Sequence, residues 1–178
     1  MERQIIDENH QESLIARLAS RLIALPFDAG ESGLSSTLDE IGNSSGADRT
    51  AVYCCSPGRV ASNAIAEWSH SEAAAAAASL TLDSSLFPRL KNAVDRGEIV
   101  DVDSGQLFTI RFPDSAANVK GRCLGVTRVV PLSWPDVECS FLTIVYAEKP
   151  PPLSEATKDE LRIASRKSPL GMKSVHWR

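Results

Sequence analysis

The sequence predicts an α+β domain in which a central antiparallel sheet carries the terminal helices on one face. Helical apolar periodicity marks both ends of the chain, and the alternation typical of strands dominates its middle. Short turn signals join consecutive strands as hairpins. Helices at both ends of a hairpin-rich chain can pack together on one face of the resulting sheet.

Apolar stripes place helices at four points of the chain. The first stripe repeats leucine at positions 14, 18, 22 and 25 and ends at Pro26, because the residue before proline avoids helical geometry. Ser154 is a typical N-cap for the last helix. An alanine-rich stretch over residues 69–79 adds a short helix, since alanine is the best helix former. The four helices are expected over residues 12–25, 33–43, 84–96 and 154–165.

Five segments alternate with the period of a strand. The two longest, residues 125–132 and 140–146, are expected to pair as a hairpin joined at 134–136. The segment between residues 103 and 121 is predicted to be irregular. The predicted strands are residues 49–55, 60–68, 99–102, 125–132 and 140–146.

Length and charge limit the classes of function. With 178 residues, the chain has room for about one domain, which we place at residues 12–165 between tails at 1–11 and 166–178. Its net charge of -4 offers no clustered basic face, so we expect neither nucleic acid nor an anionic membrane as a partner. The acidic N-terminus is unlike a signal peptide, and no apolar run has transmembrane length, which predicts a cytoplasmic protein.

Four segments of the chain resemble the GAF domain family. Residues 46–53, GADRTAVY, are similar to its first strand, and residues 66–68, AEW, to the end of its second. Residues 96–103, RGEIVDVD, resemble the short strand after its cross-helix. Its closing run is matched by RVVPL at 128–132, followed by a hairpin and PLSE at 152–155. The resemblance implies that one face of the sheet carries the terminal helices and that the other, beneath a cross-helix and long loops, holds a pocket.

The resemblance also implies a sensory or regulatory function. Members of the family bind cyclic nucleotides, tetrapyrroles or small metabolites, or serve as dimerisation units, usually upstream of a kinase, a cyclase or a transcription module. The Asn-Lys-Phe-Asp-Glu signature of the cyclic-nucleotide versions is missing here, as are the Asp-Ile-Pro motif and Cys-His pair of the bilin-binding versions. The ligand or cofactor is therefore unknown. We expect a homodimer through the first and last helices, and a signalling partner.

Four residues are candidates for the wall of the implied pocket: Tyr53, Trp68, Phe87 and Arg128, with residues 73–78 as part of its lid. Tyrosine and tryptophan supply apolar area with one polar handle. Arg128 stands in the middle of an apolar strand, where it would favour an anionic or carboxylate ligand. The alternatives are a core position for Tyr53 and an exposed strand face for Arg128.

No pattern of catalytic or metal-ligating residues is found. The sequence contains no nucleophile elbow, HExxH, phosphate-binding or dinucleotide-binding motif, and its four cysteines form no CxxC pair. We therefore expect no enzyme and no metal site. Two alternatives stay open: a dimerisation module that binds no ligand and, more remotely, an enzyme resembling the free methionine sulfoxide reductases of the family, with Cys55 and Cys123 approaching across the pocket.

Overall fold

A computed structural model of the chain describes residues 16, 17, 20–22, 30–55, 64–70, 79–82, 87–104, 108–111, 125–132, 134, 137 and 139–166. Their regular elements follow one another as α2 (Gly30–Ser45), β1 (Arg49–Cys55), β2 (Ala66–Ser69), β3 (Ser79–Leu82), α4 (Phe87–Asp95), β4 (Val100–Asp103), β5 (Phe108–Arg111), β6 (Val126–Leu132), β7 (Cys139–Tyr146) and α6 (Glu155–Arg166).

The centre of the molecule is a five-stranded antiparallel sheet with the strand order β2-β1-β7-β6-β4. The two long strands β6 and β7 pair along their whole length, from Val126 opposite Tyr146 to Leu132 opposite Ser140. This confirms the predicted hairpin, and β1 has the bounds that the alternation predicts. The antiparallel sheet of the predicted α+β fold is therefore present.

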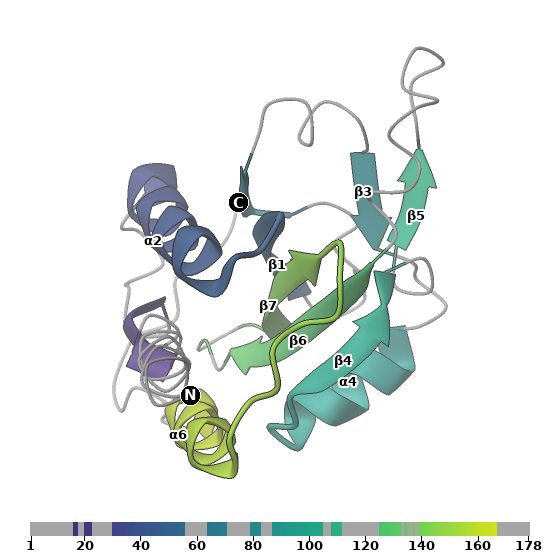
Figure 1. The fold of residues 1–178 in the computed structure, drawn as a ribbon. Coiled ribbons are helices and arrows are strands. Elements are labelled where there is room, and N and C mark those ends of the chain that lie inside the picture. The colour runs from purple at the N-terminus through teal and green to yellow at the C-terminus, as the bar shows by residue number, and fades with distance from the viewer. Residues whose placement is uncertain are drawn as a thin grey trace.

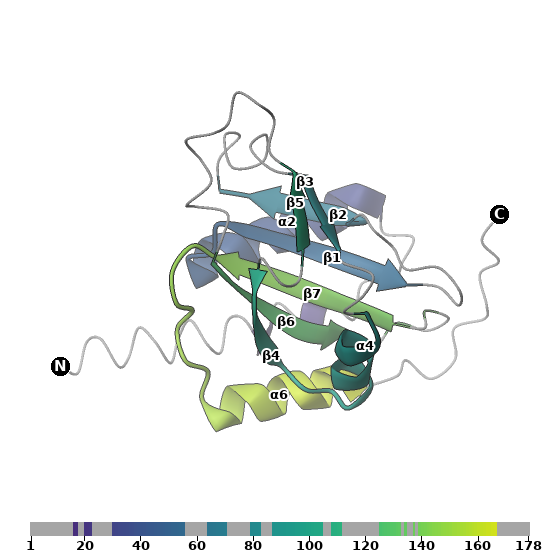
Figure 2. The same ribbon diagram turned by 90° about the vertical axis from the view of Figure 1, so that its right-hand side faces the viewer.

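The helices divide between the two faces of this sheet, as Figures 1 and 2 show. Helix α2 contacts β1 and β2, and α6 contacts β6 on the same face. The described helical residues near the N-terminus include Ala16 and Leu22, which are buried in the core of that face. Helix α4 contacts β6 and β7 from the opposite side. The terminal helices therefore share one face, as predicted.

Local signals set the helix ends. Gly46 follows α2 with a φ of 65° and Gly97 follows α4 with a φ of 66°, a conformation that costs glycine little. At the start of α6 the Ser154 hydroxyl accepts a hydrogen bond from the backbone N–H of Thr157 at 3.2 Å, as expected for an N-cap. No helix in the described part of the chain is both long and apolar enough to cross a bilayer.

A second, two-stranded sheet corrects the sequence prediction. Strands β3 and β5 pair antiparallel from Ser79 opposite Arg111 to Leu82 opposite Phe108, where an alanine-rich helix end and an irregular segment were expected. Their partners lie far apart in sequence, so no local turn announces the pairing. Figures 1 and 2 place this small sheet on the α4 side of the large one. Strand β2 is also shorter than predicted, because residues 64 and 65 are not in the strand.

The main hydrophobic core lies between the large sheet and the terminal helices. It is one cluster of buried side chains that includes residues of α2, α6 and the inward face of the strands. Its largest fully buried members are Leu22, Leu38, Ile41, Leu142, Ile144 and Leu161.

Candidate functional site

Strand pairing assigns each side chain of the sheet to one of two faces. The Thr50 hydroxyl donates a hydrogen bond to the backbone carbonyl of Leu38 in α2 at 3.0 Å, so Thr50 faces the terminal helices. Because successive strand residues point to opposite faces, Ala51 and Tyr53 face α4. We call these the helix face and the α4 face. The α4 face is the one on which the sequence predicts the pocket.

Tyr53 and Phe141 form the centre of the α4 face. They are directly opposite each other on β1 and β7, and their rings stack with centroids 5.5 Å apart and an interplanar angle of 16°. Tyr53 is 1% exposed and Phe141 is 0% exposed. Around them lie apolar side chains of the same face and of α4, namely Ala51, Leu90, Ala93, Val129 and Val145. The aromatic pair is therefore covered on all sides in this structure.

A charged pair lies next to the aromatic pair. Arg49, on the same face of β1 as Tyr53, forms an ion pair through Nη2 with the Glu67 carboxylate of β2. The Arg49 side chain is 10% exposed, whereas that of Glu67 is 49% exposed. Burial raises the pKa of Tyr53 to about 12, with Arg49 opposing the shift and Glu67 adding to it. The α4 face thus holds a neutral phenol, a stacked aromatic ring and a buried cation. The sequence predicted Tyr53 for this face but selected neither Phe141 nor Arg49.

The four predicted site residues are not brought together. Tyr53 lies on the α4 face, and Phe87 begins α4 on that side, although its side chain is outside the described part of the structure, as are residues 73–78. Trp68 is opposite Thr50 and so lies on the helix face, where it contacts α2 so closely that a Cβ on Gly42 would be 2.0 Å from its ring. The prediction that Trp68 lines the same wall as Tyr53 is wrong. Trp68 shares the face of its partner Thr50, and Thr50 and Tyr53 point to opposite faces because they are an odd number of residues apart on β1.

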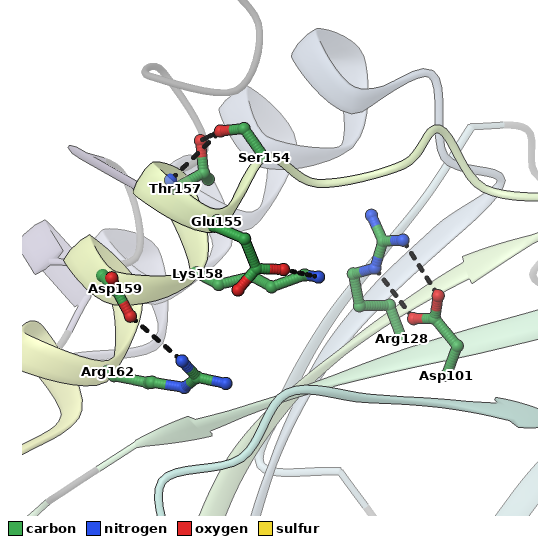
Figure 3. Close-up of polar contacts among 8 residues, drawn as sticks. All are labelled: Asp101, Arg128, Ser154, Glu155, Thr157, Lys158, Asp159 and Arg162. Carbon is green, nitrogen blue, oxygen red and sulfur yellow. Dashed lines mark hydrogen bonds and ion pairs between the residues drawn. The ribbon is translucent and has the colours of Figure 1, made fainter.

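Arg128 also lies on the helix face, contrary to the prediction for the pocket wall. It is opposite Ile144, a member of the helix-face core. It is 4% exposed, so the alternative of an exposed strand position is wrong as well. Its guanidinium binds the Asp101 carboxylate of β4 by two hydrogen bonds, Nε to Oδ1 at 2.8 Å and Nη2 to Oδ2 at 2.9 Å (Figure 3). A buried arginine does require an anion, but here a neighbouring strand supplies it.

Tyr146 completes the surroundings of Arg128. The Arg128 guanidinium carbon lies 6.0 Å from the centroid of the Tyr146 ring, within the range of a cation–π contact. Burial raises the pKa of Tyr146, and the charge of Arg128 acts in the opposite direction. Asp101 reaches Arg128 because the antiparallel pairing of β4 with β6 puts the two residues directly opposite each other.

The cysteines and histidines of the described residues do not assemble a reactive site. His70 is exposed and meets the edge of the Trp68 ring with centroids 6.2 Å apart. Cys55 is the register partner of Cys139. Cys123 lies outside the described residues, and so does the approach of Cys55 to Cys123 that the enzymatic alternative requires. Within the described residues, no group of three or more His, Cys, Asp or Glu side chains could hold a metal ion.

Among the solved structures that are similar to the chain are three GAF domains. The GAF domain of Acinetobacter phosphoenolpyruvate-protein phosphotransferase is 15% identical, with a TM-score of 0.51 and a match covering 89% of each chain. The phycoerythrobilin-bound GAF domain of a cyanobacterial phytochrome is 18% identical with a TM-score of 0.48, covering 88% of this chain and 95% of that one. The phycocyanobilin-bound GAF domain of a cyanobacterial phytochrome is 19% identical with a TM-score of 0.49, covering 86% and 92%.

No protein-family model matches the sequence, and no curated protein matches it either. At these identities a structural likeness establishes the fold, and the phosphotransferase domain carries it. The antiparallel sheet, the terminal helices on one face and the separate helix on the other agree with that likeness. The chain therefore has the GAF fold.

Proposed function

We propose that the chain is a cytoplasmic sensory module that binds a small molecule on the α4 face and passes the resulting change to a partner through its terminal helices. The observation that carries the proposal is the contrast in how the two faces are covered. Strands β3 and β5 pair with each other rather than with the large sheet, and α4 rests on it by side-chain packing. Such a cover can lift without breaking the hydrogen-bonded sheet beneath it.

The groups beneath the cover define the class of ligand. The stacked rings of Tyr53 and Phe141 offer a flat apolar floor to a planar ligand, as ligand pockets generally do. Arg49 offers a guanidinium to a carboxylate or another anion. Its partner Glu67 is half exposed and can turn into solvent when a ligand replaces it. We therefore propose a small planar molecule with an acidic group, with Phe87 contributing from the cover.

Because Tyr53 and Phe141 are fully covered, binding must displace part of their cover, to which we assign α4 because it packs on β6 and β7. The proposed site is therefore closed in this structure and differs in that respect from a pocket that is open before the ligand binds. The expected signature of binding is a change in hydrogen exchange over Phe87–Asp95, the residues of α4, together with a rise in melting temperature. A ligand present at one hundred times its Kd stabilises the native state by about 2.7 kcal/mol.

A thermal-shift screen with planar aromatic carboxylates tests the proposal. We expect at least one compound to raise the melting temperature of the wild type, and the rise to be lost in Arg49→Gln. Trp68→Phe is the matched control, because Trp68 neighbours the same strand on the opposite face, and its ligand-induced rise should persist. A panel without any stabilising compound, or a rise that Arg49→Gln leaves intact, would contradict the proposed function.

A second candidate function, a dimerisation module, has one observation in its favour. Ile163 on α6 is 57% exposed and is the large hydrophobic side chain that stands out on the described surface. A second copy of the chain packing on α6 would bury it. Sedimentation velocity should then show a dimer for the wild type and a monomer for Ile163→Lys. The control is Asn92→Lys, at an exposed position of α4, and a monomeric wild type would reject the module.

A further inference from the structure

Two buried hydroxyls on the α4 face, which we call the hydroxyl pair, belong to Ser104 and Thr127. The two residues are 1% and 0% exposed, and their hydroxyl oxygens lie 2.7 Å apart. Each hydroxyl carries one proton, and the single hydrogen bond between them uses only one of the two. Among the described residues, neither hydroxyl has a further acceptor. One buried O–H donor of the pair is therefore left over.

Other buried hydroxyls of the same sheet donate to backbone carbonyls. The Thr143 hydroxyl, also on the α4 face, donates to the carbonyl of Ala51 at 3.2 Å. The Ser140 hydroxyl donates to the carbonyl of Leu132 at 2.9 Å. A buried hydroxyl in a protein interior is usually bonded in this way. The hydroxyl pair departs from the rule, and its remaining donor is available to an acceptor from outside the sheet.

The backbone holds the hydroxyl pair in a fixed position. Thr127 lies within the sheet, where it is opposite Val102 of β4 on one side and Val145 of β7 on the other. Ser104 follows β4, and its backbone N–H donates to the carbonyl of Gly125 at 2.8 Å. Groups that recognise a ligand by position need such rigid support.

The hydroxyl pair lies in one row of the α4 face with Arg49. Register puts Arg49 of β1 and Thr127 of β6 opposite the same residue of β7, Val145. Neighbouring strands are about 4.8 Å apart, so the Cα atoms of Arg49 and Thr127 are about 10 Å apart. Val145 between them is apolar and buried. A guanidinium and a hydroxyl donor therefore mark the two ends of an apolar strip.

We propose that the hydroxyl pair is the second polar contact for the ligand of the α4 face, and that it donates its remaining proton to a carbonyl oxygen or a ring nitrogen. A neutral acceptor is favoured over a second carboxylate, because two neutral hydroxyls do not compensate a buried charge. The inference rests on the proposed function and defines its ligand more closely. The ligand is a planar acid whose carboxylate binds Arg49 and whose neutral acceptor lies at the opposite end, roughly 10 Å away. Helix α4 packs on β6, the strand of Thr127, so the opening that the proposed function requires adjoins the pair.

Urea unfolding without any ligand tests whether the second proton lacks an acceptor. Ser104→Ala combined with Thr127→Val removes both hydroxyls, and replacing both partners of a hydrogen bond by apolar groups is nearly neutral when no other bond is lost. We expect the unfolding midpoint of this double variant to equal or exceed that of the wild type. Thr50→Val should lower the midpoint, because the Thr50 hydroxyl donates to the Leu38 carbonyl at 3.0 Å. A double variant with a midpoint below the wild type would show that the second proton is already bonded, to the protein or to an internal water, and would overturn the inference.

Calorimetry with two naphthoic acids tests recognition by the hydroxyl pair. One acid has an acetyl group at the end of the ring system opposite the carboxylate, and the other has an isopropyl group there, which is similar in shape but accepts no hydrogen bond. We expect the wild type to bind the acetyl compound about tenfold more tightly, as one additional neutral hydrogen bond provides. The double variant Ser104→Ala with Thr127→Val should bind the two acids equally. Each single variant keeps one hydroxyl that can still donate, so the double variant is the informative one.

Two further variants separate this contact from the rest of the site. Arg49→Gln should weaken the binding of both acids by the same factor and keep the preference for the acetyl compound. Thr50→Val, at a buried hydroxyl of the opposite face, is the matched control and should keep both the affinity and the preference. If the wild type binds the two acids equally and Arg49→Gln weakens both, the second contact is overturned and the proposed function stands. If neither acid binds and the thermal-shift screen yields no stabilising compound, the proposed function itself is rejected, and this inference with it.

Discussion

Leu142 and Phe141 are neighbours on β7 and both are 0% exposed, yet they lie in different environments. Leu142 belongs to the helix-face core, which joins α2, α6 and four strands in one apolar cluster. Phe141 lies on the α4 face, where its stacking partner Tyr53 has a hydroxyl and Arg49 is close by. Complete burial therefore serves two purposes in this molecule: one face secures the fold, and the other holds polar groups beneath a separate cover.

The polar groups of the two faces are satisfied in different ways. On the helix face, Arg128 is neutralised within the sheet by Asp101. On the α4 face, the hydroxyls of Ser104 and Thr127 bond each other at 2.7 Å in a fully buried position. The α4 face also holds the Arg49–Glu67 ion pair, and neutral hydroxyls can exchange partners at less cost than a buried ion pair. The Ser104–Thr127 contact is thus the polar contact of the two faces that is best suited to rearrangement.

The largest expected effect comes from truncating these two neighbours. Leu142→Ala should lower the free energy of unfolding by about 4 kcal/mol, because a core held by two helices and the sheet cannot close the cavity. Phe141→Ala should cost no more than about 3 kcal/mol despite the larger side chain, because α4 can settle into the space. Urea unfolding measures both, and a larger loss for Phe141→Ala would remove the distinction between the faces.

Gly42→Ala should be the next most damaging change. A Cβ there would lie 2.0 Å from the Trp68 ring, and the ring itself packs against the helix-face core. Overpacking of this kind costs about 3 kcal/mol when neither neighbour can move. Ser36→Ala, at an exposed position of the same helix, is the control and should leave the melting temperature nearly unchanged. A stable Gly42→Ala would show that the helix face is as adaptable as the other.

The fold was largely readable from the sequence where the signals are local. Strand β1 matches its predicted bounds, and the hairpin of β6 and β7 was expected, because alternation over seven or eight residues specifies a strand by itself. Strands β3 and β5 have only four residues each and pair across the chain, so neither carried enough signal.

The candidate site was less readable, because it depends on register. Alternation predicts that Tyr53 shares a face with Ala51, but it does not say which residue of another strand lies opposite. Trp68 and Arg128 were therefore assigned to the wrong face, although Trp68 is opposite Thr50 and Arg128 is opposite Ile144. A shift of one residue in either pairing would have reversed the result. Arg49 was overlooked because a charged residue at the start of a strand usually lies in solvent.

Removing the Asp101 carboxylate tests how the helix face tolerates the charge of Arg128 when its partner is absent. Asp101→Ala should destabilise the protein by about 2 kcal/mol, less than for a fully buried pair because the Asp101 side chain is 42% exposed. Adding Arg128→Met should restore most of the loss, since the methionine removes the uncompensated charge and fills the space. Chemical unfolding of both variants checks this. A double variant as unstable as Asp101→Ala would mean that Arg128 contributes packing rather than charge.

The smallest expected effect concerns Tyr53 and the integrity of its cover. Burial raises the pKa of Tyr53 from 10.0 to about 12, so the native state holds the phenolic proton more tightly than the unfolded state does. The resulting stabilisation is fully present below pH 10 and is lost as the pH rises towards 12. At pH 11 the loss is about 1 kcal/mol relative to pH 9. Urea unfolding at both pH values should show that the free energy of unfolding decreases less for Tyr53→Phe than for the wild type, by this amount. Burial also raises the pKa of Tyr146, but that residue is present in both proteins and contributes equally. Equal decreases in the two proteins would mean that water already reaches the Tyr53 hydroxyl, and that the cover of the α4 face opens without a ligand.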